Sequence, residues 1–306
     1  MKHDAVRGAA GTASTGIRAG AGSRLFDGLN AVIMLALVFA TFYPLYYIFV
    51  VSVSNGSAVM RGDVAFWPHG FNWDTYRLIF KDPSIVRSYG NTILYTTVGT
   101  AINLICTALC AYPLSKKDFY GRSVFTLLIV FTMFFSGGLI PSYLLVQKLG
   151  MLNSIWALVI PGAISVWNMI IMRTFFQGIP AELYDSAQID GANELTSLVR
   201  ITLPLSKPIM ATMAMFYAVG HWNSFFPAMI YLDEKVKFPL QIVLRNMVVM
   251  GEMSSQSQEI SGVFASVTAT NIKYAVIVIA VLPIVMIYPF VQKYFIKGTM
   301  IGSLKG

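Results

Sequence analysis

The chain has 306 residues, of which 56% are apolar and only 12% are charged. Because a soluble domain carries about 25% charged residues, this composition excludes an ordinary cytosolic enzyme, a disordered protein and a secreted disulfide-rich scaffold. It indicates an integral membrane protein. The net charge of +8 comes from 22 Lys and Arg that are scattered between apolar blocks, as in loops beside membrane spans, so we expect no nucleic-acid partner.

The chain starts with a segment that is rich in Gly, Ala and Ser and carries Arg7, Arg18 and Arg24. We expect residues 1–26 to form a flexible basic cytoplasmic tail. The segment resembles the start of a signal peptide, but the apolar run after it is too long and no small-residue cleavage site closes that run. We therefore predict that the run stays in the protein as the first membrane span of a domain over residues 27–306.

A membrane-spanning helix needs about 20 mostly apolar residues, and six segments meet this requirement. They are Leu29–Val53, Asn91–Leu114, Val124–Val146, Ile155–Phe176, Ile209–Leu232 and Tyr274–Ile296. The predicted fold class is therefore an all-α membrane protein with six transmembrane helices. Cys106 and Cys110 lie in the second segment without a nearby His or carboxylate to complete a metal site, so we expect no metal or other cofactor on this chain.

The distribution of basic residues predicts the orientation of these spans. With the N-terminus inside, most Lys and Arg fall on the cytoplasmic side, as the positive-inside rule requires, and the short basic turn Ser115-Lys116-Lys117-Asp118 is the best marker. Both termini are then cytoplasmic. Residues 54–89 and 233–273 form outer loops, and residues 173–208 form a cytoplasmic loop.

The spans lack the groups that would power transport. None of the six contains Asp or Glu, whereas ion-coupled carriers usually need buried ionisable groups. The chain has no G-x-x-x-x-G-K-[ST] phosphate loop, and no H-E-x-x-H or G-x-S-x-G motif of a hydrolase. We therefore expect a protein that is not an enzyme, and any uphill transport must draw its energy from a partner.

The cytoplasmic loop has the pattern of two short helices joined by a sharp turn. Pro180 suits a first helical position, Glu182 and Asp185 suit the early turns of a helix, and Gly191 can adopt the left-handed conformation that ends one. A second helical run, Asn193–Thr202, should end before Leu203. This pattern alone fits a surface connection between two spans as well as a docking element for a partner.

The spacing in this loop resembles the Glu-Ala-Ala loop of ABC importer permeases. Asp185-Ser186-Ala187 is followed by three residues, Gly191, nine residues, Ile201, one residue and Leu203-Pro204. Asp replaces the usual Glu at 185 and Ser replaces the first Ala at 186. Both changes keep the charge or the small size, although a shorter acid could shift a salt bridge.

Three further segments resemble carbohydrate permeases of the maltose type. They are the outer-loop segment Phe71–Tyr76, the W-N-x-x-x-P segment in His221–Pro227 and the C-terminal segment Gln292–Gly306. The resemblance covers Leu29 to Gly306, and within the family it points to the aldouronate and alginate branch, which takes up oligosaccharides.

The resemblance implies a type I ABC importer permease fold with a coupling helix in the cytoplasmic loop, in a bacterial cytoplasmic (inner) membrane. The implied partners are a second homologous permease, two ATPase subunits that bind ATP and Mg, and a solute-binding protein that delivers an oligosaccharide. The implied ATPase-docking residues are Glu182, Asp185, Ser186, Ala187, Asp190, Gly191, Ala192, Ile201, Leu203 and Pro204.

Polar and aromatic residues inside the spans are candidates for the sugar path. Tyr217, Gly220, His221 and Ser224 form one stripe on the fifth span, and a second stripe of Thr96, Thr100, Asn103 and Thr107 lies on the second span. Since sugars stack on aromatic rings and hydrogen-bond through their hydroxyls, the candidate contacts are Trp167, Asn168, Tyr217, His221, Trp222 and Asn223. The same residue types also join helices to each other inside a bilayer, so both roles stay open.

Three other functions remain open from the sequence. The chain could be a stand-alone secondary carrier or channel, a membrane scaffold whose cytoplasmic loop docks a regulatory partner, or an ABC permease for a peptide or an ion. An ATPase that copurifies with the chain would exclude the first two.

Overall fold

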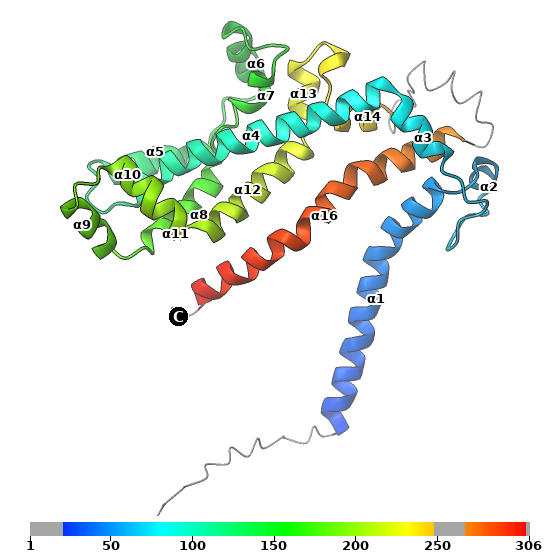
Figure 1. Cartoon of the computed structure of the whole chain (residues 1–306), viewed down its shortest axis with the longest axis horizontal. Coiled ribbons are helices and arrows are strands. Elements are labelled where there is room, and N and C mark those ends of the chain that lie inside the picture. Colours follow the sequence, from blue (N-terminus) through cyan, green and yellow to red (C-terminus); the bar gives the residue numbers. More distant parts are fainter. Residues whose placement is uncertain (1–20, 248–266, 304–306) are drawn as a thin grey trace, which may run out of the picture. The chain divides into compact units, whose positions relative to one another are not determined.

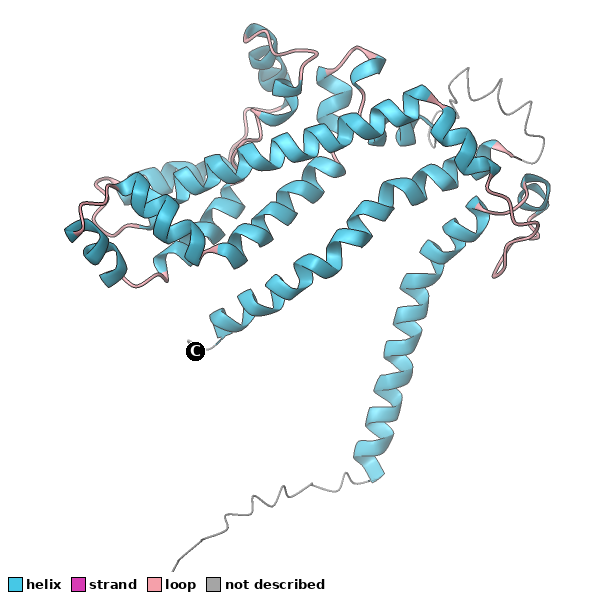
Figure 2. Ribbon diagram, viewed as in Figure 1, coloured by secondary structure: helices cyan, strands magenta, loops and turns pink. Residues whose placement is uncertain are grey.

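The computed structural model describes residues 21–247 and 267–303. These residues are mostly helical and include no strand, which confirms the all-α prediction (Figure 2). The chain divides into two compact units, Met1–Tyr47 and Ile48–Gly306. The predicted tail lies largely outside the described residues, but helix α1 (Ala21–Ser52) already includes residues 21–26.

The first part of α1 is an apolar helix. From Leu25 to Phe42 its large apolar side chains are exposed, for example Leu35 at 69% and Phe39 at 60%. Within a membrane the helix satisfies its own backbone hydrogen bonds, so these side chains can face lipid or another subunit.

The first predicted outer loop, residues 54–89, contains two short helices and the start of a long one. Helix α2 (Gly56–Arg61) is capped by Asn55, and α3 (Asp74–Lys81) is followed directly by α4 (Pro83–Ser115). Asp82 Oδ1 accepts from the backbone N–H of Ser84, 2.9 Å away, and Pro83 occupies the first turn. Because of this cap, α4 starts at Pro83, earlier than Asn91, the residue at which the sequence predicted the span to begin.

Three of the predicted spans are interrupted. The third consists of α5 (Arg122–Phe134) and α6 (Leu139–Lys148), which meet at 114°. The fourth divides into α7 (Ile155–Val159) and α8 (Val166–Gln177), and the fifth into α12 (Lys207–Trp222) and α13 (Phe226–Tyr231). Gly and Pro near the breaks favour non-helical backbone; Gly138, for instance, has φ +85°.

The second predicted outer loop, residues 233–273, leads into the last helix. It contains a short 3-10 turn (Lys235–Lys237) and α14 (Leu240–Arg245), while residues 248–266 lie outside the described part. Helix α16 (Ala269–Ser303) begins before Tyr274, the predicted start of the span. Among the described helices, three are long and apolar enough to cross a membrane, Leu25–Ser52, Pro83–Ser115 and Ala269–Pro289, and the bent α5–α6 pair would be a fourth.

Within the second unit, α4 packs along α8 and α12, and α12 also packs against α16 (Figure 1). One core lies where α4, α8 and α12 meet, around Ala111, Met172 and Met213. A second core joins α3, α14 and α16 around Leu78, Leu240 and Val276. The predicted cytoplasmic loop connects α8 to α12, so its helices are attached directly to this packed group.

Candidate functional site

The first helix of the predicted cytoplasmic loop, α9 (Glu182–Ile189), begins after Pro180 and Ala181. The sequence predicted Pro180 as the first helical residue, but the helix starts two residues later. A turn precedes it, and in this turn the N–H of Tyr184 donates to the carbonyl of Ala181 at 2.9 Å. Glu182 and Asp185 do lie in the first turn, where the helix dipole stabilises a negative charge.

The sharp turn after α9 is made by Gly191, as the sequence predicted. Gly191 has φ +80°. Its N–H donates to the carbonyl of Gln188 at 3.0 Å, and the N–H of Ala192 donates to that of Ala187 at 2.9 Å. This is the Schellman pattern of a helix end. An added Cβ at Gly191 would meet no atom within 4 Å, so the position requires glycine for its conformation and not for space.

The second helical run is longer than predicted. Asn193 caps α10 (Glu194–Ser197), which continues through a π-helical turn (Leu198–Thr202) into α11 (Leu203–Leu205). The expectation of an end before Leu203 was wrong, because the wider π turn lets the helical path run through Pro204, which has no N–H to donate. The chain leaves helical geometry at Ser206, directly before α12.

The docking residues expected from the sequence lie on one continuous segment. Glu182, Asp185, Ser186, Asp190 and Gly191 are exposed, as is Pro204. A second group, whose members are all partly buried within the loop, consists of Ala187, Ala192, Ile201 and Leu203. The docking residues on α9 therefore present a mostly polar surface.

The structure adds exposed apolar side chains that sequence reasoning did not assign to docking. Ile189 is 86% exposed, Leu195 62% and Leu183 42%. Leu183 and Ile189 lie on α9, which buries no residue, and Leu195 lies on α10.

A cavity of about 530 Å³ lies between the end of α4 and the helices α9 and α10. Tyr112 on α4 crosses it and donates to Glu194 Oε2 at 2.7 Å. Lys116 and Tyr184 also line it, with the Lys116 ammonium 3.0 Å from the centre of the Tyr184 ring. The sequence marked the basic turn at Lys116 for orientation only, and nothing in it indicated this contact.

Inside the spans, Asn103 of α4 binds the unwound backbone between α7 and α8. Its Nδ2 donates to the carbonyl oxygens of Gly162 and Ala163 at 2.8 and 2.9 Å. The Oδ1 atom of the same side chain lies 2.5 Å from His221 Nε2. Because an amide oxygen can only accept, His221 Nε2 is the donor in this hydrogen bond. The side chain thus satisfies carbonyls that have no helical partner, as interrupted helices in a membrane require.

The fifth-span stripe also makes contacts between helices. The Tyr217 hydroxyl lies 2.6 Å from Thr107 Oγ1 and accepts from the N–H of Ser165 at 3.2 Å. Trp222 is buried, and its Nε1 donates to the carbonyl of Ala280 on α16 at 2.9 Å. These bonds join α12 to its neighbours, which is the packing role that the sequence left open.

The other candidates for the sugar path are placed differently. Asn168 is buried at the start of α8, while Asn223 donates to the carbonyl of Val219 in the helix that it ends. Trp167 is 63% exposed and presents its ring outward from α8.

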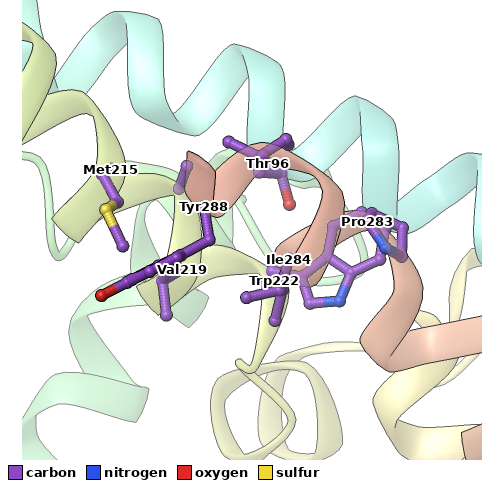
Figure 3. Close-up of a pocket in the computed structure, with 9 residues that line it drawn as sticks. Thr96, Met215, Val219, Trp222, Pro283, Ile284 and Tyr288 are labelled. Atoms are coloured by element: carbon purple, nitrogen blue, oxygen red, sulfur yellow. The ribbon is translucent and has the colours of Figure 1, made fainter. Parts of the chain in front are cut away.

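A small cavity of about 60 Å³ lies where α4, α12 and α16 meet (Figure 3). Trp222, Val219, Pro283 and Ile284 line it with apolar surface, and Thr96 reaches it from α4. A cavity of this size and lining offers little to the hydroxyls of a sugar.

The comparisons with known proteins agree with this architecture. Residues 103–300 match the family model described as "Binding-protein-dependent transport system inner membrane component". Protein LplC of Bacillus subtilis (strain 168) is 44% identical over 92% of this chain and 96% of its own. The polygalacturonan/rhamnogalacturonan transport system permease protein YtcP of the same organism is 40% identical over 93% of this chain and 99% of its own.

A solved structure is also similar. One chain of a bacterial ABC transporter involved in the import of the acidic polysaccharide alginate superposes with a TM-score of 0.85 and 36% identity, covering 90% of this chain and 98% of that chain. The match confirms the expected ABC importer permease fold. The chain therefore belongs to the family of inner membrane components of binding-protein-dependent transport systems.

Proposed function

We propose that this permease subunit, which is a transport protein and not an enzyme, carries an oligosaccharide released from a polysaccharide into the cell. The names of its relatives support this substrate class: one permease is assigned to polygalacturonan and rhamnogalacturonan, and one similar structure to alginate. The sugar is delivered from outside by a solute-binding protein.

The observation that carries the proposal is the exposed surface of α9. The helix buries none of its residues, yet it is held at a defined place by its Schellman turn and exposes Leu183 and Ile189. Exposed apolar side chains ringed by polar ones are typical of protein interfaces. In this proposal an ATPase subunit covers α9, and Glu182, Asp185 and Asp190 pair with its basic or polar groups.

The remaining partners follow from the same arrangement. No cofactor is known for this family; ATP and Mg bind to two partner ATPase subunits. A second, homologous permease completes the membrane pathway, and apolar surfaces such as those of α1 and α5 face this subunit or lipid. Both chain termini lie in the cytoplasm, on the same side as α9.

ATP drives transport through differential binding. ATP closes the ATPase pair, which displaces α9, and the ATPase pair binds one state of the permease more tightly than the other. The permease thereby switches from an inward-open to an outward-open state. Trp167, Asn168, Tyr217, His221, Trp222 and Asn223 remain candidates for the sugar path, and the exposed ring of Trp167 is free for stacking.

The test is a pull-down of the tagged chain in mild detergent, followed by an ATP-hydrolysis assay on the purified complex. We expect an ATPase and a second permease to copurify. With its binding protein, the complex should be stimulated by one member of a panel of uronate, arabino-, galacto- and malto-oligosaccharides. A chain that purifies without an ATPase would overturn the proposal, and stimulation by a peptide alone would overturn its substrate class.

A further inference from the structure

Helix α9 is held to the rest of the protein mainly by one side chain. Of its eight residues, only Tyr184 and Ala187 are partly buried. The Tyr184 hydroxyl lies 3.0 Å from Thr202 Oγ1 in the π-helical turn. Burial is the main reason why the pKa of Tyr184 is raised, so the phenol stays neutral and can keep this hydrogen bond. Tyr184 is therefore the main side-chain contact through which α9 touches the rest of the permease.

The residue that covers this ring belongs to the end of α4. Lys116 directly follows α4, and its N–H donates to the carbonyl of Pro113 at 3.1 Å. Its ammonium lies 3.0 Å from the centre of the Tyr184 ring and 4.9 Å from that of the Tyr112 ring. A cation over the face of an aromatic ring is attracted by the ring quadrupole. Lys116 thus bridges a ring on α4 and a ring on α9, whose centres are 6.4 Å apart.

Among the described residues, no carboxylate forms a salt bridge with the Lys116 ammonium. The salt bridges within the described part of the chain are Arg61–Asp63, Asp74–Arg77 and Glu234–Lys237. Burial lowers the pKa of Lys116, while the charges of Glu194, Asp118 and Asp185 act in the opposite direction. The ring contacts are therefore the closest interactions that hold the ammonium in place.

We propose that Lys116 is a positioning residue that fixes α9 to the end of α4, so that a movement of α9 is passed to α4. The inference rests on the proposed function, in which the ATPase moves α9. Helix α4 also carries Asn103 and Thr107, whose hydrogen bonds hold the unwound backbone before α8 and the Tyr217 hydroxyl of α12. A displacement of α4 would therefore reach the interrupted fourth span and the fifth span together.

The test uses the purified transporter complex in lipid nanodiscs and two native probes on α4, the free thiols of Cys106 and Cys110. The rate at which a membrane-permeant maleimide labels these cysteines is measured by mass spectrometry of this chain, with and without ATP and vanadate. ATP hydrolysis and the amount of copurified ATPase are measured on the same samples. The variants are Lys116→Met, Lys116→Arg and Tyr184→Leu, with Lys117→Met as the matched control, since Lys117 is the adjacent exposed lysine.

In the unmodified complex we expect nucleotide to change the labelling rate of the α4 cysteines. Because both variants lose the cation–π contact, Lys116→Met and Tyr184→Leu should each reduce that change at least about twofold. The amount of bound ATPase should stay the same in both variants. Lys116→Arg should keep the nucleotide-dependent change in labelling rate of the unmodified complex, and so should Lys117→Met. The double variant Lys116→Met/Tyr184→Leu should be no worse than either single one.

Four results would overturn the inference: no nucleotide effect on α4 in the unmodified complex, a full response in Lys116→Met, additive effects in the double variant, or a loss of ATPase in Lys116→Met alone. A complex that never contains an ATPase would instead overturn the proposed function, so the two failures are distinguishable.

Discussion

The imidazole of His221 on α12 lies directly against Gly99 on α4, where an added Cβ atom would come within 2.5 Å of Nε2. The ring cannot move away freely, because Nε2 is bound to Asn103 Oδ1, one helical turn along α4. The close approach of α4 and α12 therefore depends on the absence of a side chain at this one position.

We expect Gly99→Ala to destabilise the permease by about 1 to 3 kcal/mol, the usual cost of overpacking a well-packed interior. The measurement is the thermal unfolding of the detergent-solubilised protein. Gly90→Ala on the same helix is the control, because a Cβ there meets nothing within 4 Å; it should be neutral or stabilising. Equal stability of the two variants would mean that α4 and α12 do not approach as described.

Replacing Asn103 by Leu should weaken the fourth span. The change removes both donors to the carbonyls of Gly162 and Ala163, and each buried carbonyl left without a partner costs about 1 to 3 kcal/mol. We expect a lower unfolding temperature and faster proteolysis between α7 and α8. Thr97→Val is the matched control, since the exposed Thr97 hydroxyl bonds only to carbonyls of its own helix. A stable Asn103→Leu protein with an intact 160–165 segment would contradict this role.

At Gly191 the order of tolerance should be Gly, then Asn, then Ala, then Val. The site offers space, so the loss arises from the positive φ, which Asn adopts more readily than Ala and which β-branched residues avoid most strongly. We expect Gly191→Val to insert into the membrane normally but to abolish sugar uptake in cells. Normal uptake by that variant would count heavily against the docking role of the loop.

Ile189→Ser should separate docking from folding. Because the side chain is 86% exposed, its loss should change the unfolding free energy by no more than about 0.5 kcal/mol, as at other surface positions. The amount of ATPase that copurifies should fall severalfold. Val236→Ser in the predicted outer loop before α14, where the valine is 55% exposed, should leave the ATPase bound. If both variants retain the ATPase equally, Ile189 lies outside the interface.

The structure of the loop between α8 and α12 was largely predictable because it is local. The turn at Gly191 depends on hydrogen bonds from residues 191 and 192 back to 188 and 187, and a glycine at that place in the pattern is enough to predict it. The same holds for the apolar segments, because a long apolar run in a chain with few charges has no stable place but the membrane. The π-helical turn was missed, since the pattern around Pro204 predicted only an end.

The interrupted spans could not be predicted, because hydropathy counts apolar residues and not backbone partners. The break at 160–165 persists because Asn103, about sixty residues earlier in the chain, supplies the missing donors. The sequence presented Asn103, Tyr217 and His221 as polar residues on two helical stripes, which suits a sugar path and helix packing equally well.

By itself, then, the sequence determined the membrane location and the apolar segments, which follow from composition, and the turn at Gly191, which follows from interactions between residues close together in the chain. Only the tertiary structure decided which partners the polar side chains take and that Lys116 lies on the Tyr184 ring. The physical reason is that a hydrogen bond or a cation–π contact depends on distances of about 3 Å, and such distances between remote residues are set by how the helices pack.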